Sequence, residues 1–470
     1  MNDVTHTITD GLMGFNNASA EGIHIKIGAS PMEGDPVIIT SSRKLEYIRE
    51  KLGLSPLADA VMDSIENGAD KIICLPIRPD IDGAISEIKA ENKEISGTVS
   101  ISGKPHNSFS VVIVITGKGG LNEAAFKYSV NGYTYSEELS VPLSGSYVIP
   151  DTGLTATFTL TEGQSYEVGD RYSCSTTAPQ LSNENVIAGI EKIGTVKQEA
   201  EFVHIVGSCM PDTWAAVSAL QDKLQKESHK PLFFIIEAFE KENDQDMKTY
   251  LEELEAARKK VKNFCLQVVV ARAMYTGMDN IVRDVNLAGI ICGLYAKVAV
   301  NKSIGETAEV SISEDKIVQL LPEGITDEHI DEMDQLGYLT MRQYDGLSGY
   351  YVNNARTMGA EGTDYRYAED VRVVNKIIRE TRKTALLQLQ SDIDLENPMA
   401  DLQAKVQFIR APLDKMTENK EISSAEIIIP DDAAENILKM ETLALQVRYV
   451  QRGIIRNIVI DVGKKNPYAK

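Results

Sequence analysis

The apolar positions of this 470-residue chain alternate between short continuous runs and stripes at helical spacing. Three almost wholly apolar runs predict buried strands, at residues 71–77, 230–238 and 264–271. The helical stripes predict helices at residues 42–52, 56–67, 211–227, 244–262, 281–300 and 327–336. Strands that alternate with helices in this way predict a mostly parallel sheet covered on both faces.

A different pattern occupies residues 82–180, where helical periodicity fades and Ser, Thr, Gly and Tyr become frequent. Short strand patterns follow one another there at regular spacing, which is typical of a small all-β sandwich or barrel. The α/β pattern resumes near Ser182. We therefore predict an α/β core, with a mixed sheet flanked by helices and discontinuous in sequence. An inserted all-β sandwich-like domain and extended N- and C-terminal arms complete the predicted fold.

The segment 338–383 is unusually crowded with polar and aromatic residues. Two short strand patterns flank Asp345-Gly346, which is a strong signal for a hairpin turn. The polar loop that follows, rich in Asn, Arg, Thr, Asp and Tyr, looks at first like an active-site loop. A long helix is expected near residues 370–390, and a less regular stretch follows it. Strand patterns return at residues 423–430 and 443–463.

The helix expected near residues 370–390 carries a basic stripe. Positions i, i+4, i+7 and i+11 share one helical face, and here they are Arg372, Lys376, Arg379 and Lys383, with Arg382 adjacent. On an isolated helix such a row is usually a solvated face. In a chain of formal net charge −21, a concentrated positive row also suits docking to an acidic partner.

The composition and the absent motifs exclude several classes of function. The net charge of −21 argues against a nucleic-acid binder. No dinucleotide, phosphate-loop, serine-hydrolase or zinc-protease motif occurs, and the six histidines lack metal-binding spacing. Five cysteines without a CxxC pair indicate a reducing compartment, and neither a signal peptide nor a bilayer-length apolar run is visible. We therefore expect no catalytic residues, no cofactor, no metal and no membrane insertion.

Positive charge gathers again at the C-terminus, where residues 448–470 hold six Lys and Arg against one Asp. Within this stretch, residues 455–463 alternate between apolar and polar side chains. The pattern fits an edge strand inside the molecule and equally a strand donated to a neighbour. The sequence leaves both possibilities open.

Three stretches together resemble the contractile tail sheath proteins of phages and related injection machines. The first is DVTHTITDGLMGF followed by GIHIKIGA, an arm that ends before the first core strand. The second is LSPLADAVMDSIENGADKIICLPI, and the third is DGLSGYYVNNARTM with the helix YAEDVRVVNKIIRETRK. The segment GLTATFTLTEGQSYEVGDRYSCSTTAP is also similar to the β-rich insert of some sheath relatives. The resemblance covers most of the chain.

This resemblance implies a non-enzymatic structural subunit that assembles as stacked hexameric rings around an inner tube. The implied divisions are an N-terminal arm (1–22), a first core segment (23–81), an outward-facing β-rich insert (82–180), a second core segment (181–320), a C-terminal core domain (321–451) and a C-terminal arm (452–470). The arms would add strands to neighbouring subunits through Val4, Thr5, His6, Thr7, Ile8, Ile454, Ile455, Ile458, Val459 and Ile460. A helix of the C-terminal core domain would face the tube through Arg372, Lys376, Arg379, Arg382 and Lys383.

The partners implied are other copies of the chain, the inner tube protein, and baseplate and terminator proteins, without nucleic acid. The place implied is a phage virion or tail-like particle assembled in the bacterial cytoplasm. Two rivals remain. An α/β enzyme could bind a small ligand at the carboxyl ends of its strands, although the absent motifs count against it. Another self-assembling protein, such as a tube or surface-layer subunit, is the second rival, and the α/β core argues against a tube subunit.

Overall fold

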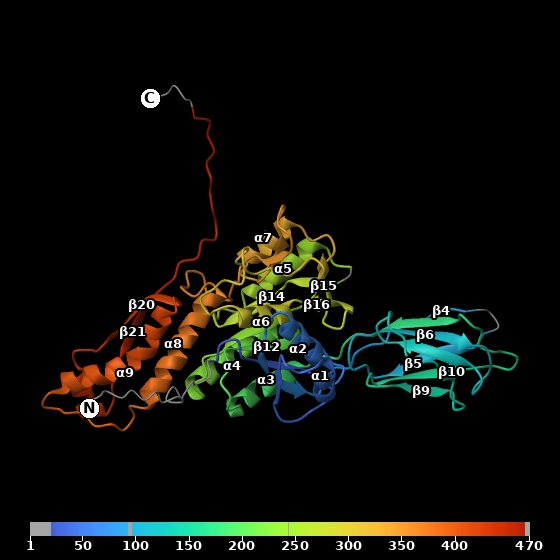
Figure 1. The fold of residues 1–470 in the computed structure, drawn as a ribbon, viewed down its shortest axis with the longest axis horizontal. Coiled ribbons are helices and arrows are strands. Elements are labelled where there is room, and N and C mark those ends of the chain that lie inside the picture. Colours follow the sequence, from blue (N-terminus) through green and yellow to red (C-terminus); the bar gives the residue numbers. More distant parts are fainter. Residues whose placement is uncertain (1–19, 93–95, 243, 466–470) are drawn as a thin grey trace, which may run out of the picture. The chain divides into compact units, whose positions relative to one another are not determined.

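The computed structural model describes residues 20–92, 96–242 and 244–465, and the chain divides into two compact units (Figure 1). The first unit comprises residues 1–299 and 304–371, and the second comprises residues 300–303 and 372–470. The division falls inside helix α8 (Ala368–Leu386), so this helix starts in one unit and continues in the other. The other domain limits expected from the sequence stay predictions.

A six-stranded sheet forms the centre of the first unit. Its strand order is β14 (Leu266–Val269), β13 (Phe233–Ala238), β12 (Phe202–Cys209), β1 (His24–Ala29), β3 (Lys71–Ile77) and β2 (Val37–Thr40). All neighbours pair in parallel except β2, which runs antiparallel to β3. The three apolar runs expected to be buried strands are β3, β13 and β14. The sheet is therefore mixed, as the sequence predicts.

Helices cover both faces of this sheet. On one face, Val186, Trp214 and Leu251 share a core with Ile25 and Ile73; they come from α3 (Asn183–Lys192), α4 (Pro211–Glu227) and α5 (Met247–Arg258). A 3-10 turn, η1 (Ile193–Thr195), follows α3. The other face packs against α1 (Leu45–Leu52), α2 (Pro56–Glu66) and α6 (Ala288–Lys297). Such two-sided burial explains why the parallel strands are apolar without alternation.

Two smaller sheets complete the α/β part of the first unit. Strands β16 (Val282–Asn286), β15 (Arg272–Thr276) and β17 (Ile317–Leu321) form an antiparallel sheet in that order. After α7 (Asp327–Gln335), strands β18 (Met341–Gln343) and β19 (Tyr350–Val352) pair around the expected turn, where Gly346 has a φ of +85°. A positive φ favours glycine, so the Asp-Gly signal identified this hairpin correctly.

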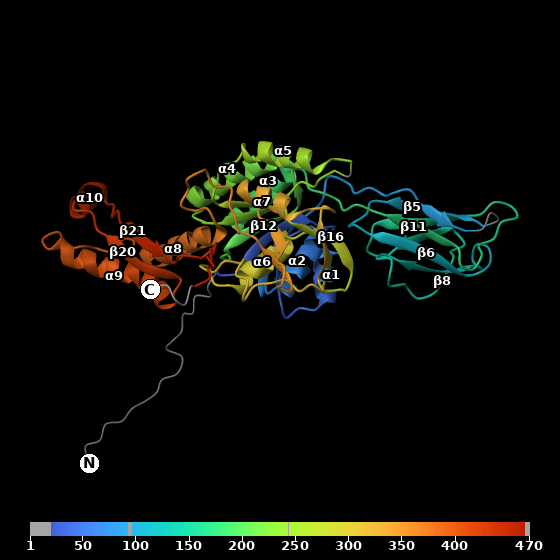
Figure 2. The same cartoon turned by 90° about the horizontal axis from the view of Figure 1, so that it is seen from above.

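Between β3 and α3 the chain forms two antiparallel sheets. One has the order β5 (Thr98–Gly103), β10 (Leu154–Thr159), β9 (Ser146–Ile149). The other has the order β4 (Lys89–Glu91), β11 (Arg171–Ser175), β6 (Ser110–Gly117), β7 (Ala125–Ser129), β8 (Leu139–Ser140). Phe126, Phe158 and Tyr166 belong to one apolar core between these sheets. Figure 1 shows the two sheets as layers, with β4 and β6 above β5, β10 and β9, and Figure 2 looks onto the sheet of β11, β6 and β8. The two sheets therefore form a sandwich.

The second unit is built on two long helices and a hairpin. Helix α9 (Pro398–Glu418) follows α8, and strands β20 (Ile422–Ile428) and β21 (Gln446–Gln451) pair antiparallel around α10 (Ala433–Met440). Val373 and Ile377 of α8 share a small core with Leu413 and Met416 of α9 and with Ile422.

Two expectations about elements are wrong. Residues 281–300 are not one helix, because β16 takes the first part and α6 starts only at Ala288, whose amide donates to the side chain of Asn286. The stretch after residue 390 holds the 21-residue helix α9 rather than irregular structure. Pro412 lies inside that helix, and an interior proline counts against a helix in any reading of the sequence alone.

Candidate functional site

The polar residues that make the segment 338–367 look like an active site are used to hold the chain together. The hydroxyl of Tyr338 donates to the carbonyl of Leu254 at 2.7 Å, and its ring lies against Trp214. Arg356 forms an ion pair with Asp334 at 2.8 Å. Through these contacts the segment holds neighbouring elements of the first unit together.

The basic row on α8 is mostly buried, which corrects the expectation that it forms an exposed face. Arg372, Lys376 and Arg379 are 1%, 7% and 6% exposed, so they do not form a basic surface on the helix. Lys376 Nζ lies 2.6 Å from a carboxylate oxygen of Glu421, which is also buried. Only Arg382 is exposed, while Lys383 is partly buried and pairs with Glu380 at 2.9 Å.

The physical reason for this correction lies in the packing of α8. Val373 and Ile377 are adjacent in sequence to the basic residues and pack into the core of the second unit. The basic side chains enter the unit with them, and a buried ammonium is tolerated only with a paired carboxylate. That carboxylate, Glu421, lies 45 positions after Lys376, so helical spacing alone could not reveal it.

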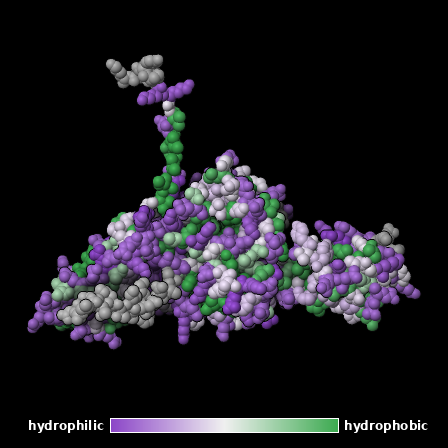
Figure 3. Space-filling model, viewed as in Figure 1, coloured by the Kyte–Doolittle hydropathy of each residue, from purple (hydrophilic) through white to green (hydrophobic). Residues whose placement is uncertain are grey.

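The C-terminal arm is extended and exposed in the described residues. Pairing between β20 and β21 ends at Gln451, and residues 452–465 form no helix or strand. Ile455 is 80% exposed and Val459 is 93% exposed, and the row of expected arm residues Ile454, Ile455, Ile458, Val459 and Ile460 is exposed throughout. Figure 3 shows this apolar segment. An apolar segment of this length is costly in water, which indicates a partner surface.

The expected N-terminal arm residues Val4, Thr5, His6, Thr7 and Ile8 lie outside the described residues. Their role therefore stays a prediction.

A chain of buried polar groups crosses the central sheet, and the sequence pattern did not reveal it. Lys26, His204 and Glu237 come from the adjacent strands β1, β12 and β13. Burial lowers the pKa of His204, and the charge of Lys26 lowers it further. Burial also raises the pKa of Glu237 to about 7, against the opposing effects of a Gly207 hydrogen bond and the charge of Arg272. Both ring nitrogens of His204 have a polar contact, so the side chain is a core residue whose polar atoms are satisfied.

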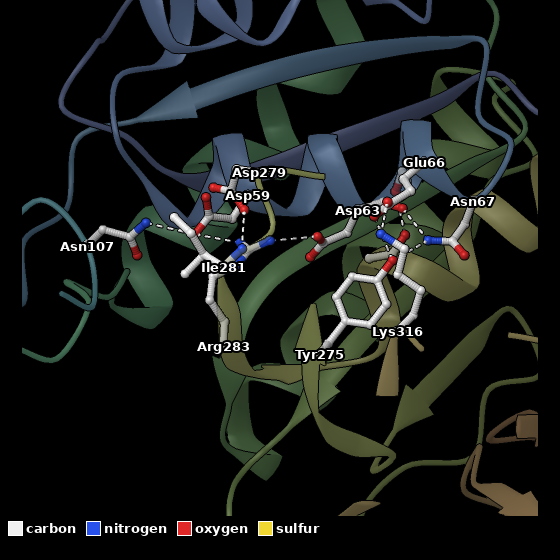
Figure 4. Close-up of polar contacts among 12 residues, drawn as sticks. Asp59, Asp63, Glu66, Asn67, Asn107, Tyr275, Asp279, Ile281, Arg283 and Lys316 are labelled. Carbon is white, nitrogen blue, oxygen red and sulfur yellow. Dashed lines mark hydrogen bonds and ion pairs between the residues drawn. The ribbon is translucent and has the colours of Figure 1, made fainter. Parts of the chain in front are cut away.

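A second polar cluster joins α2 to the sheet of β15, β16 and β17 (Figure 4). Arg283 lies between two carboxylates of α2, 2.8 Å from Asp59 and 2.9 Å from Asp63. One turn further along α2, Glu66 accepts from the hydroxyl of Tyr275 at 2.8 Å and pairs with Lys316 at 2.5 Å. The spacing of 59, 63 and 66 places the carboxylates on one helical face, which was the available signal in the sequence.

A cavity of about 530 Å³ opens beside this cluster, at the carboxyl ends of β1, β12 and β13. Ligands of α/β proteins bind at such a place, so it is where the rival enzyme would have its site. Its guanidinium groups already bind carboxylates, in the pairs Arg49–Asp279, Arg272–Glu240 and Arg283–Asp63. Among the described residues, no group of three or more His, Cys, Asp or Glu could hold a metal ion. Within the same part of the chain, every helix is too short or too polar to cross a bilayer.

Charge is distributed unevenly along the chain. Residues 1–371 carry 32 Lys and Arg against 55 Asp and Glu, whereas residues 372–470 carry 16 against 14. Residues 372–470, which make up nearly all of the second unit, are therefore close to electrical balance, and the net excess of negative charge belongs to the first unit. Repulsion between copies is weakest where the second unit makes the contact.

The fold is similar to that of solved contractile sheath proteins. The sheath tail protein from Desulfitobacterium hafniense matches 96% of this chain and 100% of its own, with a TM-score of 0.51 and 11% identity. The sheath complex of the PVC extracellular contractile injection system, in its contracted state, matches 99% of each chain with a TM-score of 0.55 and 11% identity. At such low identity the likeness establishes the fold alone. The expected resemblance to sheath proteins is confirmed at that level.

A relative from Haemophilus phage HP1, proposed to be its tail sheath protein, is 26% identical over 144 residues. The match covers 28% of this chain and spans 38% of the relative's length. Two family models match a far larger part of this chain. One, described as DUF2586, N-terminal domain, matches residues 1–356, and the other, DUF2586, C-terminal domain, matches residues 364–469. Because the two matches together cover nearly the whole sequence, the chain belongs to the DUF2586 family.

Proposed function

We propose that this chain is a structural subunit of a contractile tail sheath. It polymerises as stacked hexameric rings around an inner tube and contracts to drive the tube through a target envelope. One observation carries the proposal: the fold matches that of a contracted sheath complex over 99% of both chains. The exposed apolar arm after β21 supports it, because a subunit that works alone has no use for such a segment.

The two arms, residues 1–22 and 452–470, link neighbouring copies by adding strands to their sheets. Each backbone hydrogen bond of a donated strand contributes roughly 0.5–1.5 kcal/mol net. Several such bonds per arm outlast a large rearrangement of the subunits. Persistent links of this kind are what contraction requires.

The contact with the tube has to be releasable, and exposed charges suit it because each exposed ion pair contributes only about 0–1 kcal/mol. Of the basic residues expected to make this contact, Arg382 is the exposed one, with Lys383 beside it. We therefore assign the tube contact to this end of α8. Arg372, Lys376 and Arg379 stabilise the second unit instead.

The subunit is not an enzyme on this proposal. Its partners are further copies, the tube protein, and baseplate and terminator proteins, in a phage virion or tail-like particle assembled in the bacterial cytoplasm. The β-sandwich of residues 89–175 faces outward as an inserted domain, because insertions are tolerated at surface loops. The arginines of the 530 Å³ cavity are occupied by internal carboxylates, which weighs against the rival small-ligand enzyme.

Sedimentation velocity of the purified chain tests the proposal. The full-length chain is expected to sediment as large assemblies, and deletion of residues 452–470 is expected to yield monomers. The matched control removes an internal exposed apolar group instead, by Val318→Ser, and should leave assembly unchanged. A full-length chain that remains monomeric at high concentration would refute the proposal.

A further inference from the structure

The connection between α8 and α9 carries a concentration of exposed apolar side chains. We call residues 386–401 the distal tip. Five of its apolar residues are exposed, with Leu387 at 72% and Leu389 at 69%, and the full set is Leu386, Leu387, Leu389, Leu395 and Met399. None of these five residues belongs to the apolar core of the second unit. A cluster of this kind in so short a segment marks a contact surface.

The distal tip is also acidic. Asp392, Asp394 and Glu396 are exposed among the leucines, and no Lys or Arg occurs between Lys383 and Lys405. A partner that covers the tip therefore needs apolar side chains and positive charge together. Such a partner would bury the leucines and neutralise the carboxylates.

The chain itself contains a segment with these properties. The exposed arm of residues 452–465 carries the apolar row from Ile454 to Val462, and Arg452, Lys464 and Lys465 are exposed at its two ends. Asp461 is its only acidic residue. The arm and the distal tip are complementary in both hydrophobicity and charge.

The geometry of the second unit places the arm and the tip at opposite ends. The arm starts after Gln451, which pairs with Ile422 close to the end of α9, while the tip ends in the first turn of α9. A 21-residue helix at 1.5 Å per residue is about 31 Å long, and this length separates the two. Figure 1 shows the arm leaving the unit away from the α8–α9 connection.

We propose that the distal tip of one copy binds the C-terminal arm of a second copy. A contact between opposite ends of identical units is heterologous, so it propagates into rings or helical filaments rather than closing as a two-fold dimer. The inference rests on the proposed sheath function and names the surface that receives the arm. It adds a side-chain contact to the backbone pairing of the donated strand.

Disulfide trapping between full-length chains tests this contact. One chain carries Leu387→Cys and the other, with a longer tag, carries Ile458→Cys. The five native cysteines are all buried, so only the new thiols should react. The mixed disulfide should form about tenfold more than in a pairing of Ile458→Cys with Val318→Cys, a position of similar exposure in β17, because effective concentration decides the yield.

A charge exchange provides the second arm of the experiment. Asp394→Lys with Glu396→Lys on the tip chain should lower the mixed disulfide yield by about tenfold. Lys464→Glu with Lys465→Glu on the arm chain should restore it. Trapping at the level of the Val318→Cys control in chains that still assemble would overturn the inference and leave the sheath proposal standing. Chains that stay monomeric would overturn both.

Discussion

Lys26 and His204 face each other across the two central strands of the main sheet. Lys26 Nζ lies 2.7 Å from Nδ1 of His204, and both side chains are fully buried. On the other side of the ring, Nε2 lies 3.0 Å from Oε1 of Glu237. A neutral imidazole that accepts from Lys26 and donates to Glu237 satisfies both contacts. The ring thus links a buried ammonium to a partly buried carboxylate.

Replacing Lys26 by Met keeps the bulk of the side chain and removes this ammonium. We expect the free energy of unfolding to fall by about 3 kcal/mol, because His204 and Glu237 stay buried without their cation. Urea unfolding followed by the fluorescence of Trp214, the single tryptophan, measures the effect. The control Lys89→Met, on an exposed position of β4, should change it by less than about 0.5 kcal/mol. Equal stability of the two variants would show that the buried chain of contacts contributes little.

Buried carboxylates make stability depend on pH in a definite direction. Burial raises the pKa of Asp63 to about 6 and that of Glu237 to about 7. Both groups hold a proton in the folded chain at a pH where the unfolded chain has already lost it. The stabilisation of the folded chain by these two groups is therefore complete below about pH 4 and is lost as the pH rises to about 7.

The variant Glu237→Gln isolates one of these two groups. We expect its free energy of unfolding to fall less steeply between pH 4.5 and pH 7 than that of the unchanged chain, because the variant lacks the carboxyl that titrates in this range. Urea midpoints at a series of pH values measure the two slopes. Parallel slopes for the two proteins would contradict the assignment of Glu237 as the titrating group.

The pair of Lys376 and Glu421 is predicted to be structural. Lys376→Met leaves a buried carboxylate uncompensated and should destabilise the second unit by about 3 kcal/mol. Changing Glu421 to Met as well should recover most of that loss. The exposed pair of Lys439 with Glu435 is the matched control, and Lys439→Met should cost less than about 1 kcal/mol. Hydrogen exchange of the amides in α9 and β20 measures all three variants.

Arg382 is predicted to act only toward the tube. Because it is exposed, Arg382→Glu should change stability by less than about 0.5 kcal/mol and leave self-association intact. It should reduce co-sedimentation of the sheath with its tube. Arg379→Glu, at a buried position of the same helix, should instead destabilise the second unit. An Arg382→Glu chain that binds tubes normally would remove this residue from the contact.

The parts of the fold that local pattern governs were predictable. Fully apolar runs identified β3, β13 and β14, and the Asp345-Gly346 turn identified the hairpin of β18 and β19. The pattern failed where a local signal conflicts with tertiary packing. Pro412 counted against α9, and β16 was merged with α6 because the single residue Leu287 separates the two elements.

The sequence suggested the exposed C-terminal arm, but it did not reveal that the basic row on α8 is mostly buried. The C-terminal arm implied by the resemblance is exposed at Ile455 and Val459, and its role in linking copies stays a prediction. The spacing of the basic residues on α8 predicts that they share one face of the helix, but spacing does not show which parts of the chain cover that face. Burial of Lys376 depends on Glu421, a contact between distant parts of the sequence. Contacts of that range are what a single sequence does not contain.

Negative-stain electron microscopy of the purified full-length chain shows whether it assembles as a sheath. We predict hollow, ridged cylinders with sixfold rings, which disappear when residues 1–22 or 452–470 are deleted. Single compact particles at high concentration, with deletion of either arm changing nothing, would contradict this prediction.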